Sequence, residues 1–125
     1  MTPDALRVDI VGAPVPLQRV RWAHGRPVSD ARSMAWERTV AIAVRAAAAK
    51  AGWNSSKTHT FQVCMLIRRA RKSGDGDNFE KGILDGITKS QAVWFDDRQV
   101  SAVSWELFDG EIPGLALTIQ RVPPC

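Results

Sequence analysis

The segment GDGDNFEKGILDGITKSQAVWFDDRQV, residues 74–100, gathers five aspartates in a chain that is otherwise basic. Two carboxylates at ~4 Å repel each other by about 4 kcal/mol at an effective dielectric of ~20. Such a cluster is tolerated where the charges are spread along solvent, neutralised by Lys and Arg, or arranged around a divalent cation. The five are Asp75, Asp77, Asp85, Asp96 and Asp97.

A helix is predicted to begin near Asp77 and to run to about Thr88. Asp77 and Asn78 are good N-cap residues, and the glycines on either side of Asp75 favour a sharp turn before them. Apolar residues then recur with the spacing of a buried helical stripe. An acid, a base and an acid recur with the same spacing on another stripe, so one helix would present charges to a neighbouring cleft. The apolar stripe is Phe79, Ile83 and Ile87, and the charged one is Asp77, Lys81 and Asp85.

The pair Asp96–Asp97 follows the apolar run AVWF, and we expect it to open the next strand. If that strand returns beside the helix, Asp97 comes close to Asp75 and Asp77. An EF-hand is excluded, because Phe79 and Glu80 stand where its loop requires an oxygen ligand and a glycine. The combination of carboxylates nevertheless favours a site for a divalent metal.

Each of these residues also has an ordinary explanation. The first two aspartates fit a turn and a helix cap, and the last pair fits a turn that enters a strand. Lys81 and Asp85 fit an ion pair on a helix surface, which contributes about 0.2–0.5 kcal/mol. The metal hypothesis therefore depends on the whole set and not on any one member.

The charge balance favours a polyanionic partner. Seventeen Lys and Arg against thirteen Asp and Glu give a net charge of +4 and a pI of about 9.6. Because the acids concentrate in one segment, the rest of the surface is more basic than the net charge indicates. A positive surface of this kind suits nucleic acid.

Length and cysteine content favour one domain in a reducing compartment. The 125 residues suit a single domain over 1–125, with residues 119–125 expected as a mobile tail. No apolar run approaches the ~18 residues of a membrane span, and the N-terminus does not resemble a signal peptide. Two cysteines, one of them the last residue, indicate neither a disulfide framework nor a zinc site. We therefore expect a cytoplasmic protein.

Two basic segments are candidates for contact with nucleic acid. The first, residues 19–27, interleaves arginines with Trp22, which is typical of a hairpin laid against phosphates. Trp22 would either stack on an exposed base or pack on the core. The second segment immediately precedes the first aspartates, where cations would guide a phosphate backbone toward the carboxylates. The candidate residues are Arg19, Arg21, Arg26, Arg68, Arg69, Arg71 and Lys72.

The predicted elements run strand, hairpin, helix, strand, helix, strand, strand. The first helix is capped by Ser29 or Asp30 and ends at about Ala51, with Gly52 as its stop. The apolar run 58–69 predicts a strand within a sheet. This order indicates an α+β domain with a mixed sheet packed by two helices.

The pattern D-x-D-N-x-x-K-x-x-x-D, followed by a hydrophobic pair and D-D-x-Q-V, resembles the RusA family of Holliday junction resolvases. It spans some two dozen positions, and the N-terminal half agrees more loosely through a Pro-containing strand end, a basic hairpin and a helix. One departure is Gly74, which stands where some members of the family carry a basic residue. The pattern is carried by Asp75, Asp77, Asn78, Lys81, Asp85, Trp94, Phe95, Asp96, Asp97, Gln99 and Val100.

The resemblance implies a RusA-like, Mg²⁺-dependent endonuclease, with Mn²⁺ able to substitute. It would resolve four-way DNA junctions as a homodimer, by paired symmetric nicks in recombination and repair, in a bacterial or phage-encoded setting. Asp75, Asp77 and Asp97 would be the metal-binding catalytic carboxylates and Lys81 the catalytic lysine. Asp96 and Asp85 would be further metal ligands or their acidic neighbours.

Two other functions remain open at this point. The protein could be a metal-dependent nuclease for other branched nucleic acids, or a non-cleaving module that binds junctions. Cleavage of a junction would separate the second of these from an enzyme.

Overall fold

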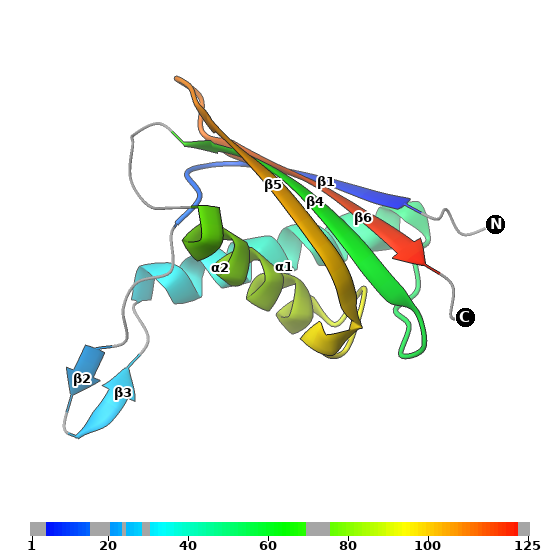
Figure 1. The fold of residues 1–125 in the computed structure, drawn as a ribbon, viewed down its shortest axis with the longest axis horizontal. Coiled ribbons are helices and arrows are strands. Elements are labelled where there is room, and N and C mark those ends of the chain that lie inside the picture. Colours follow the sequence, from blue (N-terminus) through cyan, green and yellow to red (C-terminus); the bar gives the residue numbers. More distant parts are fainter. Residues whose placement is uncertain (1–4, 16–20, 24, 29–30, 70–75, 123–125) are drawn as a thin grey trace.

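The computed structural model describes residues 5–15, 21–23, 25–28, 31–69 and 76–122, and for residues 21–23, 26–28 and 76–78 it describes the backbone alone. The predicted order of elements is confirmed (Figure 1). The elements are β1 (Ala5–Val11), β2 (Arg21–Ala23), β3 (Arg26–Val28), α1 (Ala31–Ala51), β4 (Thr60–Arg69), α2 (Gly76–Ser90), the short 3₁₀ helix η1 (Asp97–Gln99), β5 (Val100–Asp109) and β6 (Gly114–Val122).

Four strands form one mixed sheet in the order β1-β6-β4-β5, and both helices lie against the same face of it (Figure 1). Strands β4 and β5 are parallel, whereas β6 is antiparallel to β1 and to β4. A parallel pair needs a crossover connection, and α2 provides it. Strands β2 and β3 form a separate hairpin that projects beyond the start of α1. This is the expected α+β architecture.

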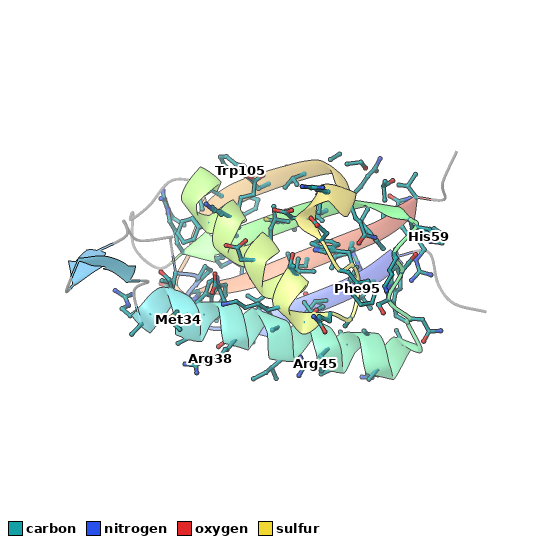
Figure 2. All side chains as sticks on the ribbon, turned by 90° about the horizontal axis from the view of Figure 1, so that it is seen from below. Met34, Arg38, Arg45, His59, Phe95 and Trp105 are labelled. Carbon is teal, nitrogen blue, oxygen red and sulfur yellow. The ribbon has the colours of Figure 1, made fainter. Side chains whose placement is uncertain are left out.

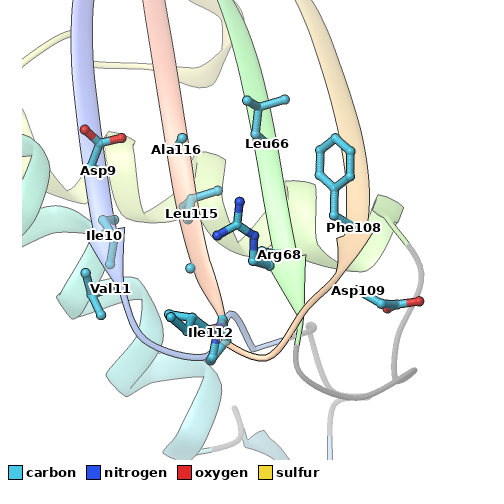
Figure 3. A pocket seen from close by; sticks show the side chains of 12 residues that line it. Asp9, Ile10, Val11, Leu66, Arg68, Phe108, Asp109, Ile112, Leu115 and Ala116 are labelled. Atoms are coloured by element: carbon cyan, nitrogen blue, oxygen red, sulfur yellow. The ribbon is translucent and has the colours of Figure 1, made fainter.

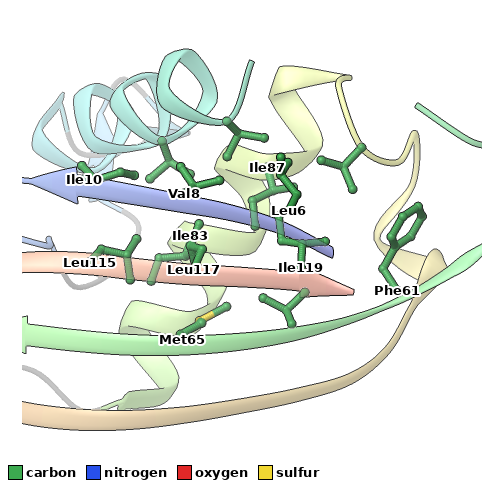
Figure 4. Close-up of a cluster of buried hydrophobic side chains, with 14 of the residues drawn as sticks. Leu6, Val8, Ile10, Phe61, Met65, Ile83, Ile87, Leu115, Leu117 and Ile119 are labelled. Atoms are coloured by element: carbon green, nitrogen blue, oxygen red, sulfur yellow. The ribbon is translucent and has the colours of Figure 1, made fainter. Parts of the chain in front are cut away.

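The core lies between the sheet and the two helices (Figure 4). Strand β4 alternates strictly, so that every second side chain from Phe61 to Ile67 is buried and those between are exposed. The predicted apolar stripe of α2 is confirmed, because Phe79, Ile83 and Ile87 are fully buried. Trp94 packs beside Phe61 with 5.6 Å between the ring centroids.

The close contact between the two helices centres on Gly86. A Cβ atom at this position would lie 2.7 Å from the Cβ of Val40 and 2.9 Å from the carbonyl oxygen of Glu37. The backbone of α2 therefore approaches α1 to a distance that only glycine permits. At the end of α1, Gly52 has φ +70° and ends the helix as expected.

Two expectations at the boundaries of elements were wrong. Asp96 and Asp97 do not open a strand, because the Asp96 carboxylate accepts a hydrogen bond from the backbone N–H of Arg98 and caps η1 instead. Strand β5 begins only at Val100. Residues 119–122 are not part of a mobile tail, since β6 continues to Val122 and Ile119 is fully buried between β1 and β4.

Among the described residues, neither helix is long and apolar enough to cross a membrane.

Candidate functional site

Helix α2 carries three of the predicted site residues. Asp77 lies in its first turn, and Lys81 and Asp85 follow one and two turns later. Helical rise is ~1.5 Å per residue, so Asp77 and Asp85 are separated by about 12 Å along the axis. Lys81 is exposed and Asp85 is half-buried. Asp75 and the side chain of Asp77 lie outside the described residues.

Asp85 sits in an environment that disfavours its charged form. Burial of the side chain raises the pKa of Asp85, and the neighbouring negative charge of Glu37 raises it further. The charges of Lys81 and Lys89 oppose this rise, while the charge of Asp97 adds to it. Negative charge at this point of α2 is therefore only partly compensated by the two lysines.

Glu37 is a functional candidate that the sequence analysis did not identify. It lies on the buried face of α1, and its carboxylate accepts a hydrogen bond from Lys89 Nζ of α2 at 2.5 Å. The carboxylate side chain is 11% exposed and the lysine 51% exposed, so the acid is the enclosed partner. The available signal was an acid placed between Ser33 and Val40 on a buried helical face, where a charge needs a partner.

Asp96 and Asp97 are exposed at the start of η1. The backbone N–H of Arg98 hydrogen-bonds to the Asp96 carboxylate and lowers its pKa, and a hydrogen bond with the side chain of Asp97 lowers it as well. The lowered pKa keeps the Asp96 carboxylate charged near neutral pH, and both side chains are open to solvent, where a cation could reach them.

Of the predicted carboxylates, the structure brings Asp97 toward Asp85. The two are close enough for the charge of Asp97 to raise the pKa of Asp85, and η1 lies beside the later turns of α2 (Figure 1). Asp77 starts the opposite end of the same helix. Among the described side chains no group of three or more His, Cys, Asp or Glu could hold a metal ion. The proximity of Asp75, Asp77 and Asp97 stays a prediction.

The arginines at the end of β4 point to opposite faces of the sheet. Arg69 lies on the helix side, and its Nε donates to Asp109 Oδ1 of β5 at 2.7 Å. Arg68 lies on the open face, against Gly110 (Figure 3). The backbones of Arg21 and Arg26 belong to the projecting hairpin. Arg19, Arg71 and Lys72 lie outside the described residues.

The open face of the sheet, opposite to the helices, carries a hollow of about 580 Å³ (Figure 3). Its lining is largely apolar, and two of the side chains there are mostly exposed, Val11 at 88% and Ile112 at 69%. Leu66 and Phe108 contribute two further exposed apolar groups. The helices cover the other face, so the sheet separates this hollow from α2 and η1.

The family model for endodeoxyribonuclease RusA matches residues 12–120. The chain belongs to the RusA family. The matched region includes the hairpin, α2 and η1, and it confirms the resemblance seen in the pattern of aspartates. No curated protein matches the chain significantly.

Membership of the RusA family establishes the class of activity. The protein is an endodeoxyribonuclease, a hydrolase that resolves crossover junctions. RusA nucleases act on branched DNA and generally depend on a divalent metal. The four-stranded mixed sheet with two helices agrees with the RusA fold.

Proposed function

We propose that the protein is a Mg²⁺-dependent Holliday junction resolvase that cuts two opposed strands by paired, symmetric nicks. The observation that supports this most directly is the charged side of α2, with Lys81 exposed and η1 beside it, within a chain of the RusA family. The enzyme would act in a bacterial cytoplasm, encoded by the cell or by a phage. Its two cysteines indicate no disulfide framework, which fits a reducing compartment.

Asp75, Asp77 and Asp97 would hold the metal, and Asp96 and Asp85 would be further ligands or acidic neighbours of Asp97. The described carboxylates fit a cation, because Asp97 is exposed and because Glu37 and Asp97 both raise the pKa of Asp85. When bound, Mg²⁺ would supply a Lewis acid that activates water and stabilises the leaving 3′ oxygen. Mn²⁺, with similar oxygen ligands, would substitute for it.

Lys81 would act on the phosphate. It lies one turn after Asp77 and is exposed, so its ammonium group can reach a substrate that approaches this side of α2. A positive charge placed there would stabilise the negative charge that develops on the non-bridging oxygens in the transition state.

Basic side chains would hold the arms of the junction. The hairpin that carries Arg21 and Arg26 projects beyond the body of the domain, and Arg71 and Lys72 precede the acidic segment in the sequence. Each neutralised phosphate releases counterions, so binding should weaken steeply as salt rises. The proposed residues are Arg19, Arg21, Arg26, Arg69, Arg71 and Lys72. Arg68, on the open face of the sheet, would contact DNA only where a second copy leaves that face uncovered.

A homodimer would match the two-fold symmetry of a four-way junction and bring one active site to each of two strands. The open face of the sheet is the surface that would accept a second copy, since it combines exposed apolar side chains with balanced charges. Exposed on this face are two arginines, Arg7 and Arg68, and two acids, Asp9 and Glu106, so that identical copies can oppose unlike charges.

Cleavage of a labelled four-way junction, beside a linear duplex of the same sequence, tests this function. The native protein and Asp77→Asn are compared in Mg²⁺ and in EDTA. We expect paired nicks near the branch point that are lost in EDTA and in the variant. Equal cutting of duplex and junction would indicate a nuclease of broader range, and tight binding without cleavage in any metal would indicate a junction-binding module.

A further inference from the structure

The side chain of Gln99 joins two loops that are distant in the sequence. Its Nε2 donates to the carbonyl oxygens of Ser56 at 2.7 Å and of His59 at 3.1 Å. Its Oε1 accepts from the backbone N–H of Phe95 at 2.9 Å and of Asp96 at 3.3 Å. A primary amide has two N–H donors and one oxygen with two lone pairs, so all of its hydrogen-bonding capacity is used.

These bonds hold the turn that carries Asp97. The turn is short, η1 has no buried residue, and its Asp96 and Asp97 side chains are exposed. Little apolar burial is therefore available to fix it. Two bonds inside the turn, from Arg98 N to Asp96 Oδ1 and from Gln99 N to Asp96 O, both 3.0 Å, shape it but do not attach it to the body of the domain. Gln99 supplies that attachment.

The loop on the other side of Gln99 is itself braced. Ser56 Oγ accepts from the backbone N–H of Thr58 and of His59 at 3.2 Å, and it lies 2.6 Å from His59 Nδ1. The backbone N–H of Ser56 also donates to Val93 O at 3.0 Å. Figure 2 labels one residue of each loop, His59 and Phe95, at the same end of the molecule. The turn is thus tied to a rigid support.

Only glutamine meets these requirements at position 99. A glutamate would place an oxygen where Nε2 lies, facing the carbonyl oxygens of Ser56 and His59, and these oxygens would lose their donor. An asparagine is shorter by one methylene, and a methionine keeps the length but neither donates nor accepts strongly. The four backbone partners therefore require a side chain of this length that both donates and accepts hydrogen bonds.

We propose that Gln99 is a positioning residue that sets the conformation in which Asp97 meets the catalytic metal. This inference rests on the proposed role of Asp97 as a metal ligand. Hydrogen bonds that orient a ligand commonly change metal affinity or activity about 10–100-fold when they are lost, because a small misplacement of a catalytic group is costly. Gln99 would act through Asp97 and not on the substrate, because its amide is engaged with four backbone groups.

The test compares Gln99→Glu and Gln99→Met with the native protein. Gln91→Glu is the matched control, since it makes the same change at an exposed position in the preceding turn. Three quantities are measured: Mn²⁺ affinity from the EPR signal of free Mn²⁺, amide hydrogen exchange of residues 93–100 in EDTA, and junction affinity in EDTA. Gln99→Glu retains the acceptor for Phe95 and Asp96, whereas Gln99→Met removes all four bonds.

Both Gln99 variants should bind Mn²⁺ about 10–100-fold more weakly and exchange faster over 93–100, with the larger effect for Gln99→Met. Their junction affinity in EDTA should equal that of the control, which a general loss of folding would not allow. Native Mn²⁺ affinity in Gln99→Met would overturn the inference. Asp97→Asn separates the two hypotheses: if it also binds Mn²⁺ as the native protein does, the metal role of Asp97 fails as well.

Discussion

At the scale of single residues, Asp85 and Lys81 are neighbouring charges on one helix that lie in different environments. Asp85 is half-buried and its pKa is raised, whereas Lys81 is exposed and its charge lowers the pKa of Asp85. Removing the charge of Asp85 should therefore change the stability of the protein, whereas removing the charge of Lys81 should change the rate of cleavage.

We expect Asp85→Asn to stabilise the metal-free protein at pH 8. A carboxyl group whose pKa is raised by folding favours the protonated form, so the native protein loses stability as pH rises from the ordinary value of 3.8 through the raised value. Asparagine carries no charge at any pH. The gain in melting temperature should be present at pH 8 and disappear near pH 4, in thermal unfolding with EDTA.

The same change at an exposed position, Asp9→Asn on β1, serves as the control. An Asp85→Asn variant that is destabilised by the same amount at every pH would contradict the assigned environment of Asp85.

Lys81→Met should lower the cleavage rate by about 10²–10³-fold, as the loss of one group that stabilises transition-state charge does. Junction affinity in EDTA should change little, because one phosphate contact at most is lost. Single-turnover cleavage of a four-way junction in saturating Mg²⁺ measures the rate. Lys50→Met, an equivalent loss of charge at the far end of α1, should cleave normally; a normal rate for Lys81→Met would remove its catalytic role.

At the scale of elements, the contact between α1 and α2 determines where α2 presents its charges. Two glycines, Gly82 and Gly86, lie one turn apart on the side of α2 that faces α1, but only the second has no room for a methyl group. Glu37 and Lys89 add a hydrogen bond across the same contact. The position of Lys81 and Asp85 thus depends on helix packing as well as on their own turn.

In Gly86→Ala the new Cβ would lie 2.7 Å from the Cβ of Val40, and overpacking of this kind costs about 1–3 kcal/mol. Alanine contributes ~1 kcal/mol to a helix relative to glycine, so we expect a net destabilisation of up to about 2 kcal/mol. Gly82→Ala is the matched control: its nearest contact, Trp36 Cδ1, lies 3.7 Å away. Urea unfolding should show Gly82→Ala to be at least as stable as the native protein, and equal stability of the two variants would contradict the packing.

At the scale of the whole molecule, one face of the sheet is covered by helices and the other is open. The open face carries the hollow of Figure 3, and the nucleic-acid candidates Arg68 and Arg69 are divided between the two faces. A second copy on the open face would leave α2 and η1 of both subunits accessible to DNA. The oligomeric state is therefore part of how the site would be used.

Ile112→Glu should convert the proposed dimer into a monomer. Ile112 lines the hollow and is 69% exposed, and a charge there would lose its hydration between two copies. Light scattering should give twice 13.8 kDa for the native protein and 13.8 kDa for the variant. Ile42→Glu, 65% exposed on α1, should remain a dimer. If Ile112→Glu is still a dimer, the interface does not lie on the open face of the sheet.

The sequence by itself determined the elements and their order. The spacing of Phe79, Ile83 and Ile87 predicted α2, the apolar run 58–69 predicted β4, and Gly52 predicted the end of α1. These signals are local, because a periodic pattern reflects which side of one element faces the core. The pattern of aspartates indicated the family in the same way, from spacing along one segment.

Only the tertiary structure decided which side chains act on one another. Glu37 and Lys89 are 52 residues apart, and Gln99 and Ser56 are 43 apart, yet both pairs are hydrogen-bonded. No periodicity within α1, α2 or the loops reports such a contact, since its partner lies on another element. The close approach of the helices at Gly86 arises for the same reason. The capping of η1 by Asp96 is instead a local hydrogen bond, and it displaced the expected start of the strand.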